Sequence, residues 1–405
     1  MARKKVTLFD LSRFPPPPMT STVEITGKIG HLRSVLGQSG HDAILLGSEG
    51  AVRWLTGIRH QVIDISPDAE SPVRVLVRLR ASSTALTFLA AKTEMPRLQD
   101  QVPKVFDRVP GTELDFSESL PPLRDGALRP GDPGYSDALG AIVQPIVGGA
   151  NGPQMGKLQW LHAMTSAVLT ETAFQLKPGM TGSEVRGLVF RSLAARDLEC
   201  NLILVALAGQ EKHLHPLYSS EYRVEEGCWV KLVAGGRYAE LIASVTVMAK
   251  IGSRLSRHEA GVYGALQQGA LEYADLYRNG AVEANIYREV GRRFAEIGKR
   301  CGLDGFQHSA YHHHLGGPIS PLGNRDYLLE EGGTRRMFPW MQFAINPCDV
   351  LQSTKVELQG IVMPEGVPLM LDGSRFMLKN LELFSELRAP GGTVAAVANV
   401  IEVPA

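Results

Sequence analysis

The sequence has no excess of charge of either sign, because its 42 lysine and arginine residues equal its 42 aspartate and glutamate residues in number. A chain without a net field has no general attraction to nucleic acid or to an anionic membrane surface. We therefore expect neither nucleic acid nor membrane as a partner. A small neutral or zwitterionic molecule, or a short peptide, is the expected substrate.

Cysteine is also scarce. The chain has Cys200, Cys228, Cys301 and Cys348, which are scattered singly without CxxC spacing. Structural zinc sites and disulfide frameworks use paired or clustered cysteines, so we expect neither, and a reducing cytosol is the simplest location.

Long apolar runs are absent as well. The basic segment through Pro18 has no apolar core of a secretory signal, and no later stretch approaches the roughly 20 apolar residues of a membrane span. These features predict a cytoplasmic protein.

A chain of 405 residues is long for one hydrophobic core, and two domains are expected. The first, residues 20–150, combines a helical pattern at Ile25–Leu36 with strand-like apolar runs and is predicted to be a smaller α/β domain. Glycine and proline are frequent in residues 126–134 and again in residues 148–153, which is typical of a linker.

The second domain, residues 153–405, begins with longer periodicities. Helical patterns cover residues 155–175, 183–196, 258–277 and 283–302, and Thr181 and Glu184 have the spacing of a capping box. Strands are expected at residues 229–234, 243–249, 342–345 and 355–363. Helices on one side of a curved antiparallel sheet satisfy this order, so the class is α+β.

Several phrases together resemble the creatinase/prolidase, or pita-bread, superfamily, which includes methionine and Xaa-Pro aminopeptidases, prolidase and creatinase. Their order and spacing carry the resemblance: Arg53–Gly57 resembles a strand end of the family, Lys177–Thr181 a helix link, and His215-Pro216 a substrate-side histidine. Phe343–Pro347 and Glu357 match two later motifs. The resemblance covers most of the chain. It implies a C-terminal pita-bread domain preceded by a creatinase N-terminal-like domain, and a homodimer in which each small domain lies over the partner's site.

Peptidases of this superfamily hold two divalent ions with two aspartates, a histidine and two glutamates. At the corresponding positions this sequence has Val233, Ser244, a histidine within His312–His314, Asn346 and Glu357. His313 is the preferred equivalent, although the run leaves the choice among the three histidines open. One histidine and one glutamate offer too few anionic oxygens for two dications. The resemblance therefore implies a site without metal or other cofactor.

Other charged groups fall beside these positions. Strand alternation places Lys231 on the same face as Val233, and Lys355 on the same face as Glu357. We expect Lys231 and Lys355 to hold an anionic substrate group above a floor of Ser244 and Asn346, with His312 nearby. The alternative is a structural Lys–Glu pair that fills a retired pocket.

His215 is the expected acid/base, since a neutral imidazole near pH 7 can move a proton in either direction. Glu357 and His313 are the other candidate catalytic residues. These assignments predict a metal-independent hydrolase of a small amide- or amidine-type C–N bond. The alternatives are an inactive pseudopeptidase that binds a peptide or small ligand and, third, a genuine Xaa-Pro peptidase. Arg53, Arg59 and His60 are expected as solvated loop charges, or as groups that close the pocket on an anion.

Overall fold

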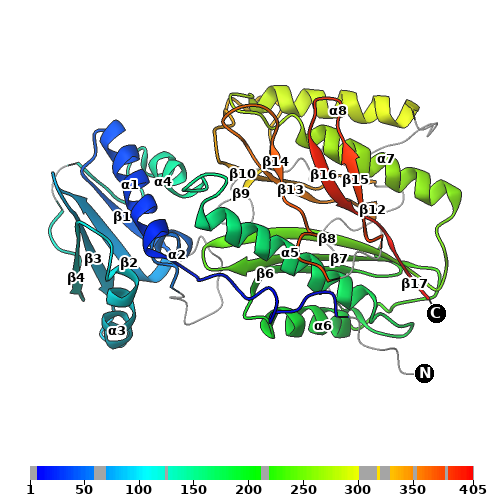
Figure 1. The fold of residues 1–405 in the computed structure, drawn as a ribbon, viewed down its shortest axis with the longest axis horizontal. Helices are drawn as coiled ribbons and strands as arrows, with labels where there is room; N and C mark the ends of the chain where they lie inside the picture. Colours follow the sequence, from blue (N-terminus) through cyan, green and yellow to red (C-terminus); the bar gives the residue numbers. More distant parts are fainter. Residues whose placement is uncertain are drawn as a thin grey trace.

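The computed structural model describes residues 7–58, 70–123, 126–210, 219–300, 317–319, 329–349, 354–378 and 382–404. A small N-terminal domain lies beside a larger one (Figure 1). Each domain has buried apolar clusters of its own. None of the helices in the described ranges combines the length and the apolar character that crossing a membrane requires.

The small domain is an α/β layer. Its five-stranded sheet has the order β4-β3-β2-β1-β5. Helices pack on one face, where Leu46, Val75 and Phe88 join Leu32 and Leu139 in a single cluster. Its elements are α1 (Thr22–Gln38), β1 (Ala43–Ser48), α2 (Glu49–Thr56), β2 (Glu70–Leu79), β3 (Thr84–Ala90), α3 (Met95–Phe106), β4 (Thr112–Ser117), β5 (Ala127–Leu128) and α4 (Tyr135–Val143).

The segment Arg53–Gly57 was expected at the end of a strand, and this expectation is wrong. The segment closes helix α2 instead. The hydroxyl of Ser48 accepts a hydrogen bond from the backbone N–H of Ala51 at the start of this helix, and Gly57 ends it with φ of 68°. A serine N-cap and a left-handed glycine are strong local helix boundaries, and here they define one short helix.

The large domain has two four-stranded sheets, β17-β8-β7-β6 and β14-β13-β10-β9, with long helices packed against them. Helix α6 starts at the expected capping box, in which Thr181 and Glu184 bond each other's backbone N–H. Strand β17 joins β8 in parallel, so the first sheet is mixed. The elements are α5 (Pro153–Ala173), α6 (Gly182–Ala194), β6 (Glu199–Ala206), β7 (Trp229–Tyr238), β8 (Leu241–Ile251), α7 (Arg257–Ala274), α8 (Glu283–Arg300), β9 (Gly317–Ile319), β10 (Gln342–Ile345), β11 (Cys348–Asp349), β12 (Thr354–Lys355), β13 (Leu358–Ile361), β14 (Leu369–Met370), β15 (Phe384–Arg388), β16 (Val394–Ala398) and β17 (Ile401–Val403).

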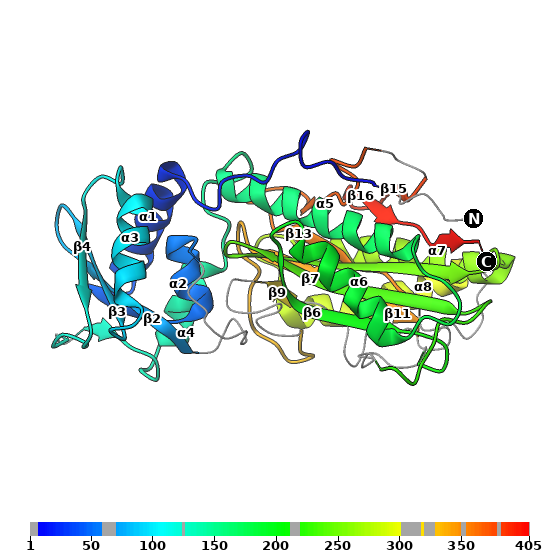
Figure 2. The same ribbon diagram turned by 90° about the horizontal axis from the view of Figure 1, so that it is seen from below.

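The N-terminal segment before α1 packs on the large domain. It runs along α5, as Figure 2 shows. The N–H of Leu8 donates to the Glu171 carboxylate at 2.6 Å, and the indole N–H of Trp160 donates to the carbonyl of Phe14 at 3.2 Å. Leu8 is fully buried in the same cluster as α5. The first residues are therefore part of the large domain's packing.

A first buried ion-pair network joins the domains. Glu24 and Lys28 of α1 meet Lys157 of α5 and Glu240 at the β7–β8 turn, with N–O distances of 2.6 to 3.1 Å and side chains at most 1% exposed. Burial raises the pKa of Glu240, but the charges of Lys157 and Lys28 outweigh it and leave that pKa lowered. The network connects helix α1 directly to the hairpin that carries the candidate site residues of β7 and β8.

A second network contains Arg53, and the expectation of a solvated loop charge is wrong. Arg53 is 1% exposed and pairs with Glu49 at 2.7 Å and with Glu199 of β6 at 2.5 Å. Arg237 of β7 completes the network on Glu49. The guanidinium of Arg53 is paired with Glu49 of the small domain and Glu199 of the large domain. It therefore joins the two domains and is not available to close a pocket. Arg59 and His60 lie outside the described residues.

Candidate functional site

Strands β7 and β8 present one face of their sheet to α5 and the other to the second sheet. On β7, Val230 and Leu232 share a core cluster with α5. Because side chains alternate along a strand, Lys231 and Val233 lie on the opposite face. The register pairs Val233 with Thr246, which places Thr246 and Ser244 of β8 on this same face. We call it the inner face.

The carboxylate of Glu357 is fixed on the inner face by β8. The hydroxyl of Ser244 donates to its Oε1 at 2.5 Å, and the hydroxyl of Thr246 donates to its Oε2 at 2.6 Å. The Lys355 ammonium lies 3.8 Å from Oε2, and both side chains are at most 3% exposed. Ser244, Lys355 and Glu357 therefore lie together. The single strand expected over residues 355–363 is wrong in one respect, because Glu357 lies in a break between β12 and β13.

Gln359 aligns the two sheets at this point. Its side chain accepts from the backbone N–H of Ser244 and donates to the carbonyl of Ile242, both at 3.0 Å. Gln359 is 1% exposed, so these bonds are protected from water. The amide side chain thereby fixes β13, and the Glu357 that precedes it, against β8.

Asn346 follows β10 and is 2% exposed, and its Oδ1 is buried without a hydrogen-bond partner. Two residues later, Cys348 pairs with Lys355 in the β11–β12 ladder and is 1% exposed. Burial lowers the pKa of Lys231, and the electrostatic interaction with Cys348 partly opposes that shift. Lys231 and Cys348 are thus within electrostatic reach of each other across the inner face.

His162 of α5 is a buried titratable group that sequence reasoning missed. Burial lowers its pKa to about 4, against the opposing charges of Asp372 and Glu357. Its Nδ1 is buried without a hydrogen-bond partner. In the sequence His162 stands within a long helical pattern, and no local signal links it to residues near positions 357 and 372.

The candidate residues His215, His312 and His313 lie outside the described residues, as does His314. The geometry above therefore concerns Lys231, Ser244, Asn346, Lys355 and Glu357, and the roles given to the histidines stay predictions.

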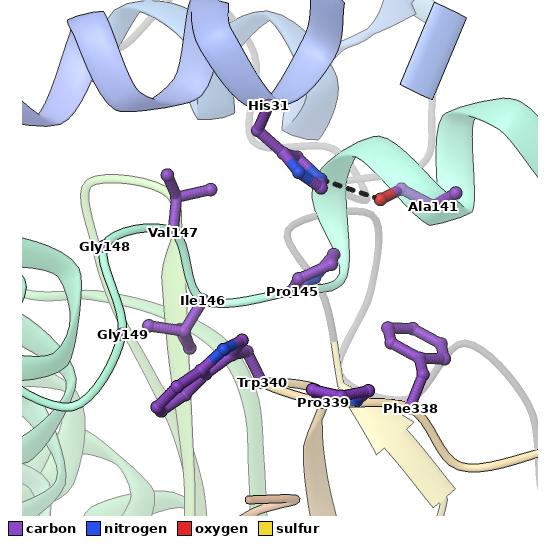
Figure 3. Close-up of a pocket in the computed structure, with 10 residues that line it drawn as sticks. All are labelled: His31, Ala141, Pro145, Ile146, Val147, Gly148, Gly149, Phe338, Pro339 and Trp340. Atoms are coloured by element: carbon purple, nitrogen blue, oxygen red, sulfur yellow. Dashed lines mark hydrogen bonds between the residues drawn. The ribbon is translucent and has the colours of Figure 1, made fainter. Parts of the chain in front are cut away.

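A separate pocket of about 380 Å³ lies where the two domains meet. Figure 3 shows His31 of α1 and the residues before α5 above Trp340, with Phe338 and Pro339 beside it. The His31 ring nitrogen Nε2 lies 3.0 Å from the carbonyl oxygen of Ala141. None of the candidate site residues lines this pocket, and its walls are apolar.

Comparison with family models gives one match, to metallopeptidase family M24, over residues 157–378. This span exceeds half of the 405 residues. The chain belongs to metallopeptidase family M24. Comparison with curated protein sequences finds no match.

Solved structures of three peptidases have the same fold. Dipeptidase PepE from Mycobacterium ulcerans is 17% identical with a TM-score of 0.59, over 95% of this chain and 99% of that chain. The prolidase from Pyrococcus horikoshii is 14% identical with a TM-score of 0.60, over 85% and 97%. Aminopeptidase P from E. coli, bound to a product, is 11% identical with a TM-score of 0.62, over 89% and 97%. The pita-bread fold expected from the sequence is confirmed.

The name of the M24 family implies a metal centre, and the described residues of the inner face do not fit one. They provide a single carboxylate, Glu357, whose two oxygens already accept hydroxyl hydrogen bonds. An ammonium group lies where a second cation would be repelled. Hard divalent ions need several anionic oxygens. In the described part of the chain no three His, Cys, Asp or Glu side chains gather in a way that could hold a metal.

Proposed function

We propose that this M24 protein is a hydrolase that cleaves an amide- or amidine-type C–N bond of a small molecule or short peptide without a dinuclear metal centre. The observation that supports it is the environment of Glu357, where hydroxyl groups and an ammonium stand in place of further carboxylates. Ammonium groups can orient an anionic substrate group, but they polarise a carbonyl less than a dication does. Activated C–N bonds are therefore better substrates than ordinary peptides.

The proposal gives each of these residues a role. Lys231 and Lys355 bind the anionic group of the substrate, Ser244 and Asn346 line the floor, and Glu357 holds Lys355 in place. The predicted roles of His215 as acid/base, and of His313 and His312 beside the substrate, belong to the same proposal. We also propose a cytoplasmic homodimer with no nucleic-acid or membrane partner.

The experiment is a hydrolysis assay on tag-free protein. A panel of N-acyl, N-carbamoyl and amidino compounds is compared with Xaa-Pro dipeptides, with and without a chelator and with added divalent metals. We expect turnover of panel compounds that neither chelator nor metal changes. Activity that disappears with chelator and returns with a divalent metal would contradict the proposal.

One observation favours a second candidate, a pseudopeptidase that binds a ligand without turnover. Lys231, Ser244 and Lys355 are only 1 to 3% exposed, as expected for side chains that fill a retired site. The two candidates differ in the same assay, because a pseudopeptidase would give ligand-dependent thermal stabilisation with no product from any compound.

A further inference from the structure

Asn201 of β6 and Asn346 at the end of β10 each have a buried amide oxygen that finds no hydrogen-bond partner among the described residues. A buried acceptor without a donor costs free energy, so proteins rarely keep one that has no task. The positions of both amides relative to the bond between Ser244 and Glu357 follow from the strand registers.

A bulge in β6 turns Asn201 toward the inner face. The β6–β7 ladder skips this residue. A Cβ at Gly235 of β7 would lie 2.0 Å from the Asn201 Oδ1, whereas a Cβ at Gly236 would meet Thr165 of α5. Because Gly236 points to α5, Gly235 points to the inner face. The amide of Asn201 therefore fills the space that a side chain at position 235 would need.

This space adjoins the hydroxyl that binds Glu357. Gly235 pairs with Ser244 in the β7–β8 ladder, and paired residues point to the same side of a sheet. The Ser244 hydroxyl donates to the Glu357 carboxylate at 2.5 Å. The Asn201 amide thus lies on the β7 side of this bond.

Asn346 approaches the same bond from the second sheet. The β10–β13 ladder ends one residue before Asn346 and one residue after Glu357, so these two are the next residues to face each other. Ala344 joins Ile242 of β8 in one apolar cluster, and alternation directs Asn346 to the same side. Asn346 is only 2% exposed, so its oxygen has little access to bulk water.

We propose that Asn201 and Asn346 bind the NH2 group of a primary amide or ureido ligand beside the Ser244–Glu357 pair. The role of this site in substrate choice rests on the hydrolase function proposed above, whereas the binding of the ligand does not. Two amide oxygens on two sides of one position accept two hydrogens, and a planar NH2 group provides both.

The surroundings favour a neutral ligand group over a cation. The Lys355 ammonium lies 3.8 Å from the Glu357 carboxylate, and it would repel an ammonium or amidinium placed beside that carboxylate. Access is from the edge of the sheet, because β6 is its last strand and Asn201 is partly exposed there. An Xaa-Pro bond has no hydrogen on its nitrogen, so it would leave both oxygens unpaired.

Two ligands that differ in one group test the site by isothermal titration calorimetry on tag-free protein. Succinamate ends in an NH2 group, and monomethyl succinate has a methoxy group in its place, with the same carboxylate at the other end. We expect succinamate to bind at least about tenfold more tightly. N-carbamoylglycine provides the ureido group. Equal affinity for the first two compounds, or no binding of either succinamate or N-carbamoylglycine, would overturn the site.

Substitution of each amide separates a ligand site from structural packing. Asn346→Leu and Asn201→Leu should each weaken succinamate binding to the level of the methyl ester. Without ligand, Asn346→Leu should keep or raise the melting temperature, because it removes an unpaired buried acceptor.

Gln359→Leu is the matched control. It should lower the melting temperature, because the Gln359 side chain bonds the β8 backbone at Ser244 and Ile242. A preference for succinamate that survives in both asparagine variants would overturn the site. So would a loss of melting temperature in Asn346→Leu as large as that in Gln359→Leu, since it would show that the Asn346 oxygen is already paired.

Activity separates this site from the proposed function. Succinamate binding that depends on both asparagines, without turnover of any panel compound, overturns the hydrolase and leaves the site in place. Hydrolysis of tertiary amides as fast as that of primary amides overturns the site and leaves the hydrolase in place.

Discussion

Replacement of Glu240 by Gln tests how the two domains are joined. Glu240 is fully buried at the β7–β8 turn, 3.1 Å from the Lys28 ammonium and 3.0 Å from that of Lys157. The neutral amide keeps the shape but leaves two buried ammonium groups with Glu24 alone. Removing one partner of a buried ion pair costs about 3–5 kcal/mol. Urea unfolding followed by far-UV circular dichroism should show a loss of this size.

An exposed pair provides the control. Asp100 and Lys104 of α3 are 2.7 Å apart, but their side chains are 68% and 70% exposed. Asp100→Asn should leave the unfolding curve unchanged, because solvent screens such pairs. A Glu240→Gln protein as stable as the wild type would show that this network does not hold the domains together.

The pH dependence of the same variant tests whether the pKa of Glu240 is lowered in the folded protein. The lowered pKa of Glu240 means that its stabilisation is present above the ordinary glutamate value of 4.5 and is lost as the pH falls further. The difference between wild type and Glu240→Gln should therefore be constant from neutral pH down to about pH 5 and shrink below it. A difference that grows on acidification would refute the assignment.

Three further predictions concern other parts of the molecule. Because buried His162 resists protonation, the unfolding free energy of the wild type should fall by up to about 3 kcal/mol between pH 6.5 and 4. His162→Gln should remove this loss, and an equal pH dependence of the unfolding free energy in both proteins would contradict the prediction. Light scattering at micromolar concentration should give a two-fold dimer, and a monomer would count against the assembly. His215→Ala should abolish hydrolysis of the panel compounds without lowering the melting temperature, and an active variant would remove His215 from the mechanism.

Local rules predicted much of the fold. The capping box of Thr181 and Glu184 marks the start of α6, and the strand at Gln342–Ile345 lies where its apolar pattern places it. These features depend on neighbours a few residues apart. Helix α2 differs from the expected strand end at Arg53–Gly57, although Ser48 and Gly57 are local signals for its two boundaries.

Long-range charge contacts could not be predicted in the same way. The buried guanidinium of Arg53 pairs with Glu199, which is 146 residues away in the sequence, and no local pattern links the two residues. The grouping of Ser244, Lys355 and Glu357 was predicted from strand alternation, although Glu357 lies between β12 and β13 and not within a strand. The pairing of Cys348 with Lys355 was not predicted, because no local sequence signal marks the short β11–β12 ladder.

The metal content of tag-free protein tests the central claim most directly. Elemental analysis after purification without metal-affinity resin should find well under one equivalent of transition metal per subunit, because the inner face offers one carboxylate that hydroxyl groups and an ammonium already occupy. Two stoichiometric divalent metals per subunit would contradict the account.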